Sequence, residues 1–259
     1  MVDNKQSEHT DAPSIVRVHH DLNRRKLTVE SVNNITPNMR RIVLNGDDLA
    51  DFVSLAPDDH IKVIVLDPSG VEQRRDYTPR SFDRSARRLV IDFALHESGL
   101  VTQWAINARP GSTLEILGPR GSAVVSTAVK RWLLIGDETA LPAIGRRIEE
   151  SDQEAEIDVI AAVAGAQEEQ SFATTASLEV RWIHRAANEA TNPSSLISAL
   201  RHIDIMPQTF VWVAAEASVA RAVRAYLLDH KNCPLSWIKA SGYWINGKAG
   251  KTESAALEC

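Results

Sequence analysis

The sequence predicts two consecutive domains, an antiparallel β-barrel followed by an α/β domain with a parallel sheet. Between residues 26 and 125, short runs of alternating apolar and polar residues recur between turn signals, which is typical of antiparallel strands. At Trp132–Ile135 a continuous apolar run appears instead, of the kind that forms buried parallel strands. Strand-like and helix-like stretches alternate from there on, and this alternation favours a parallel sheet.

The barrel strands are expected where apolar residues alternate between turn residues. Five such runs are Leu27–Val32, Met39–Leu44, Ile61–Leu66, Leu89–Leu95 and Thr113–Leu117. One helix is expected at Val101–Ala108, because Arg109, Pro110 and Gly111 then end it. We assign the barrel to residues 23–127.

The second domain is assigned to residues 128–250, where strands are expected to alternate with helices. Its predicted strands are Trp132–Ile135, Ile157–Val163, Leu178–Ile183 and Gln208–Val213, and its predicted helices follow Gly136 and occupy Ser194–His202 and Ser218–His230. Residues 1–22 are polar and lack periodicity, so a flexible arm is expected there. Residues 251–259 resemble a polar tail.

The composition is ordinary for a soluble globular protein and argues against several functional classes. The 259 residues are 44% hydrophobic and 24% charged. A net charge of −5 and a pI near 5.9 argue against a nucleic-acid binder. No apolar stretch approaches the roughly 20 residues of a membrane span, and the polar N-terminus shows no secretory signal, so we expect a cytoplasmic location. Cys233 and Cys259 suggest neither a disulfide framework nor a zinc site.

The most informative segment is Arg75-Asp-Tyr-Thr-Pro-Arg80, which lies between two strand-like runs. In an extended segment alternate side chains share a face, so Arg75 and Tyr77 point the same way. An arginine suits phosphate oxygens, a tyrosine face suits a flat heteroaromatic ring, and the hydroxyl of Thr78 can bond a ring nitrogen. The segment therefore predicts a site for a phosphate-bearing aromatic cofactor. The alternative is an exposed hairpin with ordinary surface arginines.

Further motifs follow this segment in a fixed order. They are His96–Trp104, Ala108–Gly111, Leu117–Ser122, Leu133–Ile144 and Ala240–Trp244. In this order they resemble the motifs of the siderophore-interacting protein family. Members of that family are FAD-dependent ferric-siderophore reductases and belong to the ferredoxin-reductase-like flavoproteins. The resemblance runs from about Lys26 to about Gly250. It implies that the barrel binds FAD and that the α/β domain binds a nicotinamide nucleotide.

The resemblance implies a set of FAD contacts in the first domain. Arg75 and Arg80 would contact phosphate or ribose, Tyr77 would lie against the isoalloxazine, and Thr78 would bond near its reactive edge. His96 follows the strand that lines the ring, and the alternative for it is a surface-loop histidine. The glycine-led start of the next helix presents N–H groups that suit a pyrophosphate. The remaining implied contacts are Asp92, Phe93, Gly99, Leu100, Val101 and Thr102.

The nicotinamide nucleotide is expected at the turn after the first parallel strand, where open α/β sheets bind ligands. No G-x-G-x-x-G fingerprint is present, and Asp137 and Glu138 would repel a close pyrophosphate. The alternative is a plain strand-to-helix turn with capping carboxylates. Glu216, in a similar turn later in the sheet, is a further candidate. The contacts implied by the resemblance are Asp137, Thr139, Ala140 and Trp244.

One departure from the family concerns the segment after Trp244. An arginine usually follows in the family, whereas this chain continues with Ile245, Asn246 and Gly247. The contacts of this terminal segment with the nucleotide, and the choice between NADPH and NADH, therefore stay open. Lys248 is a possible replacement for the arginine.

The resemblance implies that NADPH or NADH gives a hydride to FAD, which passes single electrons to a ferric siderophore and so releases Fe(II). Catecholate and hydroxamate oxygens hold Fe(III) far better than Fe(II), so reduction releases the iron. No catalytic side chain is expected, because the cofactor performs the chemistry. A resident metal site is not expected either, because Asp58-Asp-His60 lacks a further ligand at suitable spacing. Neither a nucleic acid nor an integral membrane segment is expected.

Three other hypotheses stay open at this point. The chain could be a flavin-bearing siderophore-binding protein with little reductase activity, or a general flavin reductase. A ferredoxin could also replace the nicotinamide nucleotide as electron donor.

A ferric siderophore is often anionic and would be repelled by a protein with a net charge of −5. We therefore expect a local basic patch near the flavin. Lys62 and Arg120 are the first candidates for substrate binding, and Lys239 and Lys248 are the next. The alternative is that Lys62 is a solvated strand lysine and Arg120 an ordinary turn residue.

Overall fold

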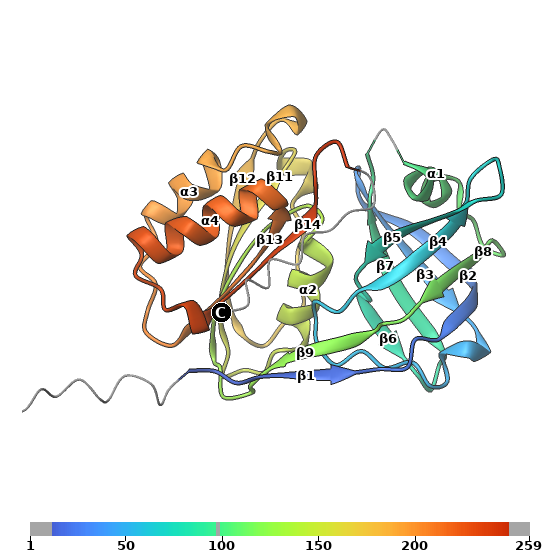
Figure 1. Cartoon of the computed structure of the whole chain (residues 1–259), viewed down its shortest axis with the longest axis horizontal. Helices are drawn as coiled ribbons and strands as arrows, with labels where there is room; N and C mark the ends of the chain where they lie inside the picture. Colours follow the sequence, from blue (N-terminus) through green and yellow to red (C-terminus); the bar gives the residue numbers. More distant parts are fainter. Residues whose placement is uncertain (1–11, 97–98, 249–259) are drawn as a thin grey trace, which may run out of the picture.

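The computed structural model describes residues 12–96 and 99–248, which form two sheet-based domains side by side (Figure 1). The predicted polar tail at residues 251–259 lies outside the described residues, as do residues 1–11 of the predicted arm. The chain passes from the first sheet to the second after β9 (Gly121–Val125), and β10 (Arg131–Asp137) begins the second sheet.

The first sheet has seven antiparallel strands in the order β5-β4-β8-β2-β3-β7-β6. The strands are β2 (Arg24–Thr36), β3 (Met39–Asn45), β4 (Ile61–Leu66), β5 (Glu72–Tyr77), β6 (Ser81–Asp83), β7 (Arg88–Ala94) and β8 (Thr113–Leu117). Each of the five runs predicted from alternation overlaps one of these strands. The predicted antiparallel domain is therefore confirmed.

The core of the first domain follows from this alternation. In β8, Leu114 and Ile116 point inward and are 2% and 0% exposed, while the residues between them face outward. Burying one such side chain stabilises the fold by about 1.5–3 kcal/mol. α1 (Leu100–Asn107), close to the predicted helix, adds Val101 and Ala105 to the same core. α1 lies across one end of the curled sheet (Figure 1).

The second sheet has five parallel strands in the order β12-β11-β10-β13-β14. Its further elements are α2 (Leu141–Glu150), β11 (Glu156–Val163), β12 (Ser177–His184), α3 (Ser194–Arg201), β13 (Thr209–Glu216), α4 (Ala217–His230) and β14 (Ile238–Trp244). The predicted alternation of strands and helices is confirmed. β14 was not predicted, because lysine, serine and glycine interrupt its apolar residues. The chain reverses its strand order between β10 and β13, so their carboxyl ends form the topological switch point.

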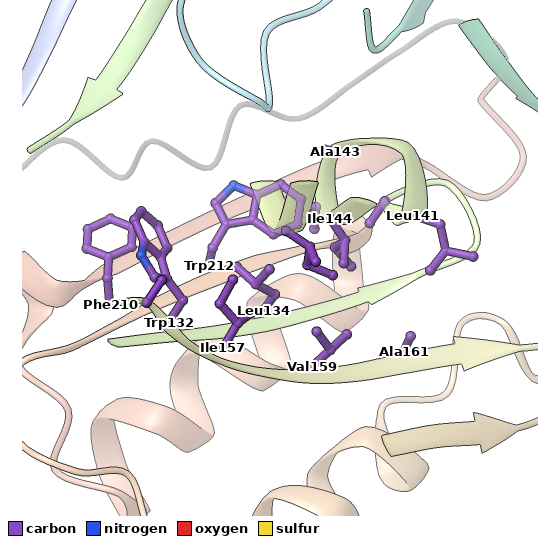
Figure 2. Close-up of a cluster of buried hydrophobic side chains, with 14 of the residues drawn as sticks. Trp132, Leu134, Leu141, Ala143, Ile144, Ile157, Val159, Ala161, Phe210 and Trp212 are labelled. Carbon is purple, nitrogen blue, oxygen red and sulfur yellow. The ribbon is translucent and has the colours of Figure 1, made fainter. Parts of the chain in front are cut away.

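Helices cover both faces of this sheet. α2 packs on one face, and Figure 2 shows its residue Ile144 beside Leu134 and Trp212 of the strands. On the other face, α3 and α4 pack against Leu133 and Ile135. Successive residues of β10 are therefore buried on opposite sides, which explains the continuous apolar run in the sequence.

Short 3-10 helices and one two-stranded ribbon complete the described chain. The 3-10 helices are η1 (Asp47–Leu49), η2 (Ala166–Glu168), η3 (Ala187–Glu189) and η4 (Leu235–Trp237). Across residues 12–96 and 99–248, no helix combines the length and the apolar character needed to cross a membrane.

The ribbon corrects the prediction of a flexible arm over residues 1–22. β1 (Ile15–His19) pairs antiparallel with β9, and the His20 ring lies 2.8 Å from the Ser122 hydroxyl. The pairing satisfies backbone groups of β9, which belongs to neither of the larger sheets. The signal was weak in the sequence because most β1 side chains are exposed, so no inward-facing pattern marks the strand.

Glu168 of the second domain provides one polar contact between the two sheets. Its carboxylate is 5% exposed and accepts hydrogen bonds from the Thr36 hydroxyl at 2.6 Å and from the Asn38 backbone N–H at 3.1 Å. Both donors flank the turn between β2 and β3. A buried carboxylate requires such partners, so this contact fixes the turn against the second domain.

Asp58 of the first domain provides a second contact. Its carboxylate lies 2.6 Å from Lys239 Nζ of β14 and accepts a hydrogen bond from Trp212 Nε1 of β13 at 3.2 Å. Burial raises the pKa of Asp58, but the charge of Lys239 and both donors lower it, and the net result is a pKa below the ordinary value. The ionised carboxylate therefore stabilises the fold.

This contact makes the stability depend on pH. Since the folded-state pKa of Asp58 is depressed, its contribution is present above about pH 4 and is lost as the pH falls through the folded-state pKa. We expect Asp58→Asn to lower the free energy of unfolding by about 1.5–3 kcal/mol at pH 7, and by less at pH 3. Urea unfolding at both pH values measures this difference. The exposed Asp204→Asn is the matched control, and an equal loss at both pH values would contradict the prediction.

Candidate functional site

The segment Arg75–Arg80 joins the two edges of the first sheet. It ends β5, one edge strand, and leads directly into β6, the other edge strand. The Arg80 backbone N–H donates to the Val90 carbonyl of β7 at 2.9 Å. The predicted cofactor segment therefore closes the sheet, and its side chains are held at the point of closure.

Three aromatic rings pack together at this closure. The rings of Tyr77 and Phe93 lie 4.5 Å apart between centroids, and Phe93 lies 5.8 Å from Trp104 of α1. Burial raises the pKa of the Tyr77 phenol, and the nearby charge of Arg75 opposes this. Tyr77 is therefore a neutral ring with a cation close to it, as the sequence predicted. Phe93, also a predicted FAD contact, is 0% exposed and packs against Tyr77.

The start of α1 lies beside the same strands. Gly99 precedes the helix with φ of 128°, where a side chain would be strained and a Cβ would come 3.1 Å from His96 Cε1. The His96 ring contacts the Thr102 hydroxyl at 3.0 Å. Val101 and Thr102 are 3% and 2% exposed, so these two residues can offer a ligand only their backbone N–H groups. Leu100 is exposed at the helix start.

Arg80 and Asp92, two of the predicted FAD contacts, pair with charged protein groups. The Arg80 guanidinium is buried and donates to both carboxylate oxygens of Glu149 in α2, at 2.7 and 2.5 Å. It also lies 3.6 Å from Asp92, which accepts two hydrogen bonds from Arg41 at 2.7 and 2.8 Å. These charges neutralise one another at the domain interface.

At the switch point of the second sheet, the Asp137 carboxylate is saturated by protein donors. One oxygen accepts from the backbone N–H and the hydroxyl of Thr139, at 2.9 and 2.5 Å. The other accepts from the Glu216 backbone N–H at 3.0 Å and from Trp244 Nε1 at 2.9 Å. A carboxylate has about four acceptor positions, and all are used. Asp137 therefore caps the turn, and its contact with the nucleotide stays a prediction.

Other predicted residues at this edge are also structural. Ala140, also a predicted cofactor contact, is 0% exposed and packs in the core under α2. Thr139 and Trp244 each direct a donor at Asp137, as described above, which leaves the Trp244 ring as the part that can face a ligand. Glu216 caps α4 by accepting from the Ser218 N–H at 2.6 Å. Burial raises its pKa, but hydrogen bonds from Ser218 and Asn246 hold it below the ordinary value.

An ion pair at the same edge was missed by the sequence analysis. Arg185 directly follows β12 and donates to the Glu138 carboxylate at 2.7 Å. Burial, and then the charge of Asp137, raises the pKa of Glu138, while Arg185 opposes the rise. The signal was available in principle, because the carboxyl ends of parallel strands meet at one edge. The sequence did not show the strand order that brings β12 to this edge.

Lys62 and Arg120, the first candidates for substrate binding, lie at the same end of the first sheet. Lys62 of β4 lies opposite Leu117 of β8, three residues before Arg120, so Lys62 and Arg120 share one end of the first sheet. Lys62 Nζ lies 2.7 Å from Asp76, which is next to Tyr77, and the Lys62 side chain keeps 40% exposure. Arg120 is exposed.

Lys239 and Lys248, the other two candidates, are less suited to binding the substrate. The ammonium of Lys239 is bound to Asp58 inside the domain interface, so Lys239 cannot serve as a substrate cation without breaking that contact. Lys248 is exposed in the turn after β14.

A serine, a histidine and an aspartate also lie together near β9, but not as a nucleophilic triad. Ser122 Oγ donates to the Asp59 carboxylate at 2.6 Å and accepts from the Leu55 backbone N–H at 3.1 Å, with His20 Nε2 at 2.8 Å. A catalytic triad requires the histidine between serine and carboxylate, whereas here the serine lies between. Burial raises the pKa of Asp59 despite its donors. In the described part of the chain, no group of three or more His, Cys, Asp or Glu side chains could hold a metal ion.

Comparison with known families matches both domains. The family model described as "Siderophore-interacting FAD-binding domain" matches residues 28–74 and 68–123. The model described as "Siderophore-interacting protein" matches residues 129–247. The two models therefore divide between the first and the second sheet.

Individual proteins are similar over nearly the whole chain. An NADPH-dependent ferric-chelate reductase of Escherichia coli K12 is 29% identical over 250 residues, which are 88% of this chain and 95% of that protein. The crystal structure of a siderophore utilization protein from T. fusca is 33% identical, with a TM-score of 0.86, over 93% of this chain and 100% of that one. A ferredoxin reductase of carbazole 1,9a-dioxygenase, 17% identical, matches with a TM-score of 0.65 over 84% of this chain and 68% of that chain, which confirms the ferredoxin-reductase-like fold.

The residues of the first domain fit FAD. Tyr77 presents an aromatic ring at the closure of the sheet, Arg75 places a cation beside it, and the N-terminus of α1 offers N–H groups for phosphate. Arg75 makes a described side-chain hydrogen bond only to the Arg74 carbonyl, at 2.7 Å. Its charge, unlike that of Arg80, is not neutralised by a carboxylate in the described contacts.

The structural role of Asp137 can be tested directly. Asp137→Asn replaces one acceptor oxygen by an amide that faces N–H donors, so we expect the free energy of unfolding to fall by about 1–3 kcal/mol. Urea unfolding followed by tryptophan fluorescence measures the loss. Asp204→Asn is again the matched control, because that side chain is exposed. If Asp137→Asn is as stable as the wild type, the four hydrogen bonds to the carboxylate do not contribute to the stability of the fold.

Proposed function

Because the chain belongs to the siderophore-interacting protein family, we propose that it reduces ferric siderophores or related ferric chelates with electrons from NADPH or NADH. The observation that carries the proposal is the match of the FAD-binding model to the sheet on which Tyr77, Arg75 and the start of α1 converge. The second match, to a relative named as a ferric-chelate reductase over 95% of its length, supports the same chemistry.

Bound FAD would accept a hydride from the nucleotide and give single electrons to iron, and the protein's side chains position it for this. Tyr77 packs against the flat ring while Phe93 and Trp104 keep Tyr77 in place. Arg75 and the N–H groups at the start of α1 neutralise the phosphates. Thr78, which is 6% exposed and hydrogen-bonds Tyr243 of β14, is the proposed contact at the reactive edge.

The nucleotide is proposed to bind at the carboxyl ends of β10 and β13. Asp137 makes this edge rigid without presenting a free negative charge, since all its acceptor positions are used. Glu138 is paired with Arg185, which reduces the repulsion of a phosphate. We propose NADPH as the preferred donor, on the resemblance to the Escherichia coli relative. A ferredoxin donor and a cytoplasmic location stay predictions.

The ferric chelate is proposed to bind where Lys62 and Arg120 share one end of the first sheet, the end at which Tyr77 ends β5. Iron leaves the chelate after reduction because hard oxygen donors hold Fe(II) weakly. Local positive charge is required because the protein as a whole carries −5.

Anaerobic mixing tests the proposed function. The purified protein, reconstituted with FAD, is mixed with NADPH or NADH and then with a ferric siderophore, while flavin absorbance and Fe(II) formation are followed. We expect rapid bleaching by the nucleotide and reoxidation by the ferric siderophore. Flavin that stays oxidised with either nucleotide would identify a binding protein, and preference for free flavin over the siderophore would identify a general flavin reductase. Failure to bind FAD would refute the proposal.

Arg75→Ala is expected to weaken FAD binding by about 1.5–3 kcal/mol, because it removes a charge-assisted contact with phosphate. Titration of the apoprotein with FAD, followed by flavin fluorescence, measures the dissociation constant. Arg74→Ala is the matched control, since Arg74 is the adjacent arginine, is exposed and pairs with Glu72. Equal effects of the two substitutions would remove Arg75 from the site.

The double substitution Lys62→Ala/Arg120→Ala is expected to raise the Michaelis constant for an anionic ferric siderophore while FAD content stays unchanged. The effect should shrink at high salt, which screens exposed charges, and should be smaller for a neutral hydroxamate chelate. Steady-state kinetics at low and high salt measure both trends. Lys130→Ala/Arg131→Ala is the matched control. It removes the same two positive charges from a different place, the amino-terminal end of β10, where both side chains pair with carboxylates. Unchanged kinetics of the first variant at low salt would place the substrate elsewhere.

A further inference from the structure

One arginine of the second domain is inserted into the first. Arg146 of α2 is 3% exposed, and its Nη1 donates to the Ser54 hydroxyl at 2.7 Å and to the Pro79 carbonyl at 3.1 Å. Its Nη2 donates to the Ser54 carbonyl at 3.0 Å, and its Nε to Glu150 at 2.7 Å. The guanidinium has five N–H donors in a rigid fork, so these acceptors fix the position of Pro79 relative to α2.

The helix comes unusually close to the first domain at this place. A Cβ at Gly145 would lie 2.9 Å from Nη2 of Arg80 and 2.8 Å from Cε1 of Phe172, closer than real Cβ contacts allow. Glycine is unfavourable inside a helix relative to alanine. Here it gives Arg80 the space to reach Glu149 one turn further along α2.

Three successive residues of the cofactor segment are therefore each held by the second domain. The Thr78 hydroxyl hydrogen-bonds Tyr243 of β14, the Pro79 carbonyl accepts from Arg146, and the Arg80 guanidinium pairs with Glu149. The first sheet holds the same stretch by the backbone bond from Arg80 to Val90. The position of the segment next to Tyr77 is thus set largely by α2 and β14.

We propose that Arg146 is a positioning residue for the flavin. It holds Pro79, and through it the two preceding residues, Tyr77 and Thr78, in the place that the ring requires. The inference rests on the proposed FAD site at this segment. Arg146 itself is buried behind the segment and bonds only to protein groups in the described contacts, so it acts on the cofactor through Pro79.

The test uses the full chain reconstituted with FAD. In Arg146→Ala we expect FAD affinity to fall about tenfold, a change equivalent to about 1.4 kcal/mol, with a shifted flavin absorption spectrum and midpoint potential. Arg146→Lys keeps the charge but loses the fork, so it should recover only part of each property. Arg147→Ala is the matched control, because it removes the next arginine of the same helix, whose guanidinium lies over the Trp132 ring at 4.1 Å. It should keep the wild-type spectrum and potential.

A double-substitution cycle separates positioning from a general loss of stability. If Arg146 acts through the segment, its effect on the midpoint potential should largely disappear in a Thr78→Val background. The proposal is overturned if Arg146→Ala unfolds more easily but keeps the wild-type affinity, spectrum and potential, or if Arg147→Ala changes them equally. If Arg146→Ala does not fold, the same readouts on Arg146→Lys decide. A wild-type chain that binds no FAD would instead refute the proposed function.

Discussion

The ion pair between Arg80 and Glu149 joins the two sheets at the point where the first sheet closes on itself. Arg80 is almost fully buried, and a guanidinium in that environment requires carboxylate partners. Glu149 of α2 supplies one and Asp92, itself held by Arg41, supplies another. The chain can therefore follow this path between its two edge strands only with α2 in place. Closure of the first sheet and docking of the second domain depend on the same contact.

The same requirement, that buried charges have partners, organises the edge of the parallel sheet. Asp137 receives four hydrogen bonds, and these tie together the turn after β10, the end of β13 and the last strand, β14. Glu216 in turn caps α4 and accepts from the Asn246 N–H. The edge is consequently rigid before any ligand binds. Glu138, with its raised pKa and its partner Arg185, is the acidic group there whose carboxylate is not saturated in this way.

The elements were largely predictable, whereas the roles of the charged residues were not. Alternation located β3, β4, β7 and β8 because each buries one face, and the apolar run located β10 because it buries two. Tyr77 was predicted to lie against the cofactor, and the structure places its ring beside Phe93 where the first sheet closes. Arg80, Asp92 and Asp137 were assigned to ligands because the sequence shows a charge but not its partner. The partner of Arg80 lies 69 positions away, and that of Asp137 at Trp244 lies 107 positions away.

By itself, the sequence determined the two-domain order, the ferredoxin-reductase-like fold and the family, because side-chain periodicity and ordered motifs are local properties. It also determined that an aromatic residue and cations gather at Arg75–Arg80. Only the tertiary structure decided which of those cations is paired with a carboxylate. Arg75 keeps its charge unpaired by a carboxylate in the described contacts, while Arg80 is neutralised by the second domain. The physical reason is that the availability of a charged group depends on what another element brings within hydrogen-bonding distance, and no local pattern encodes that.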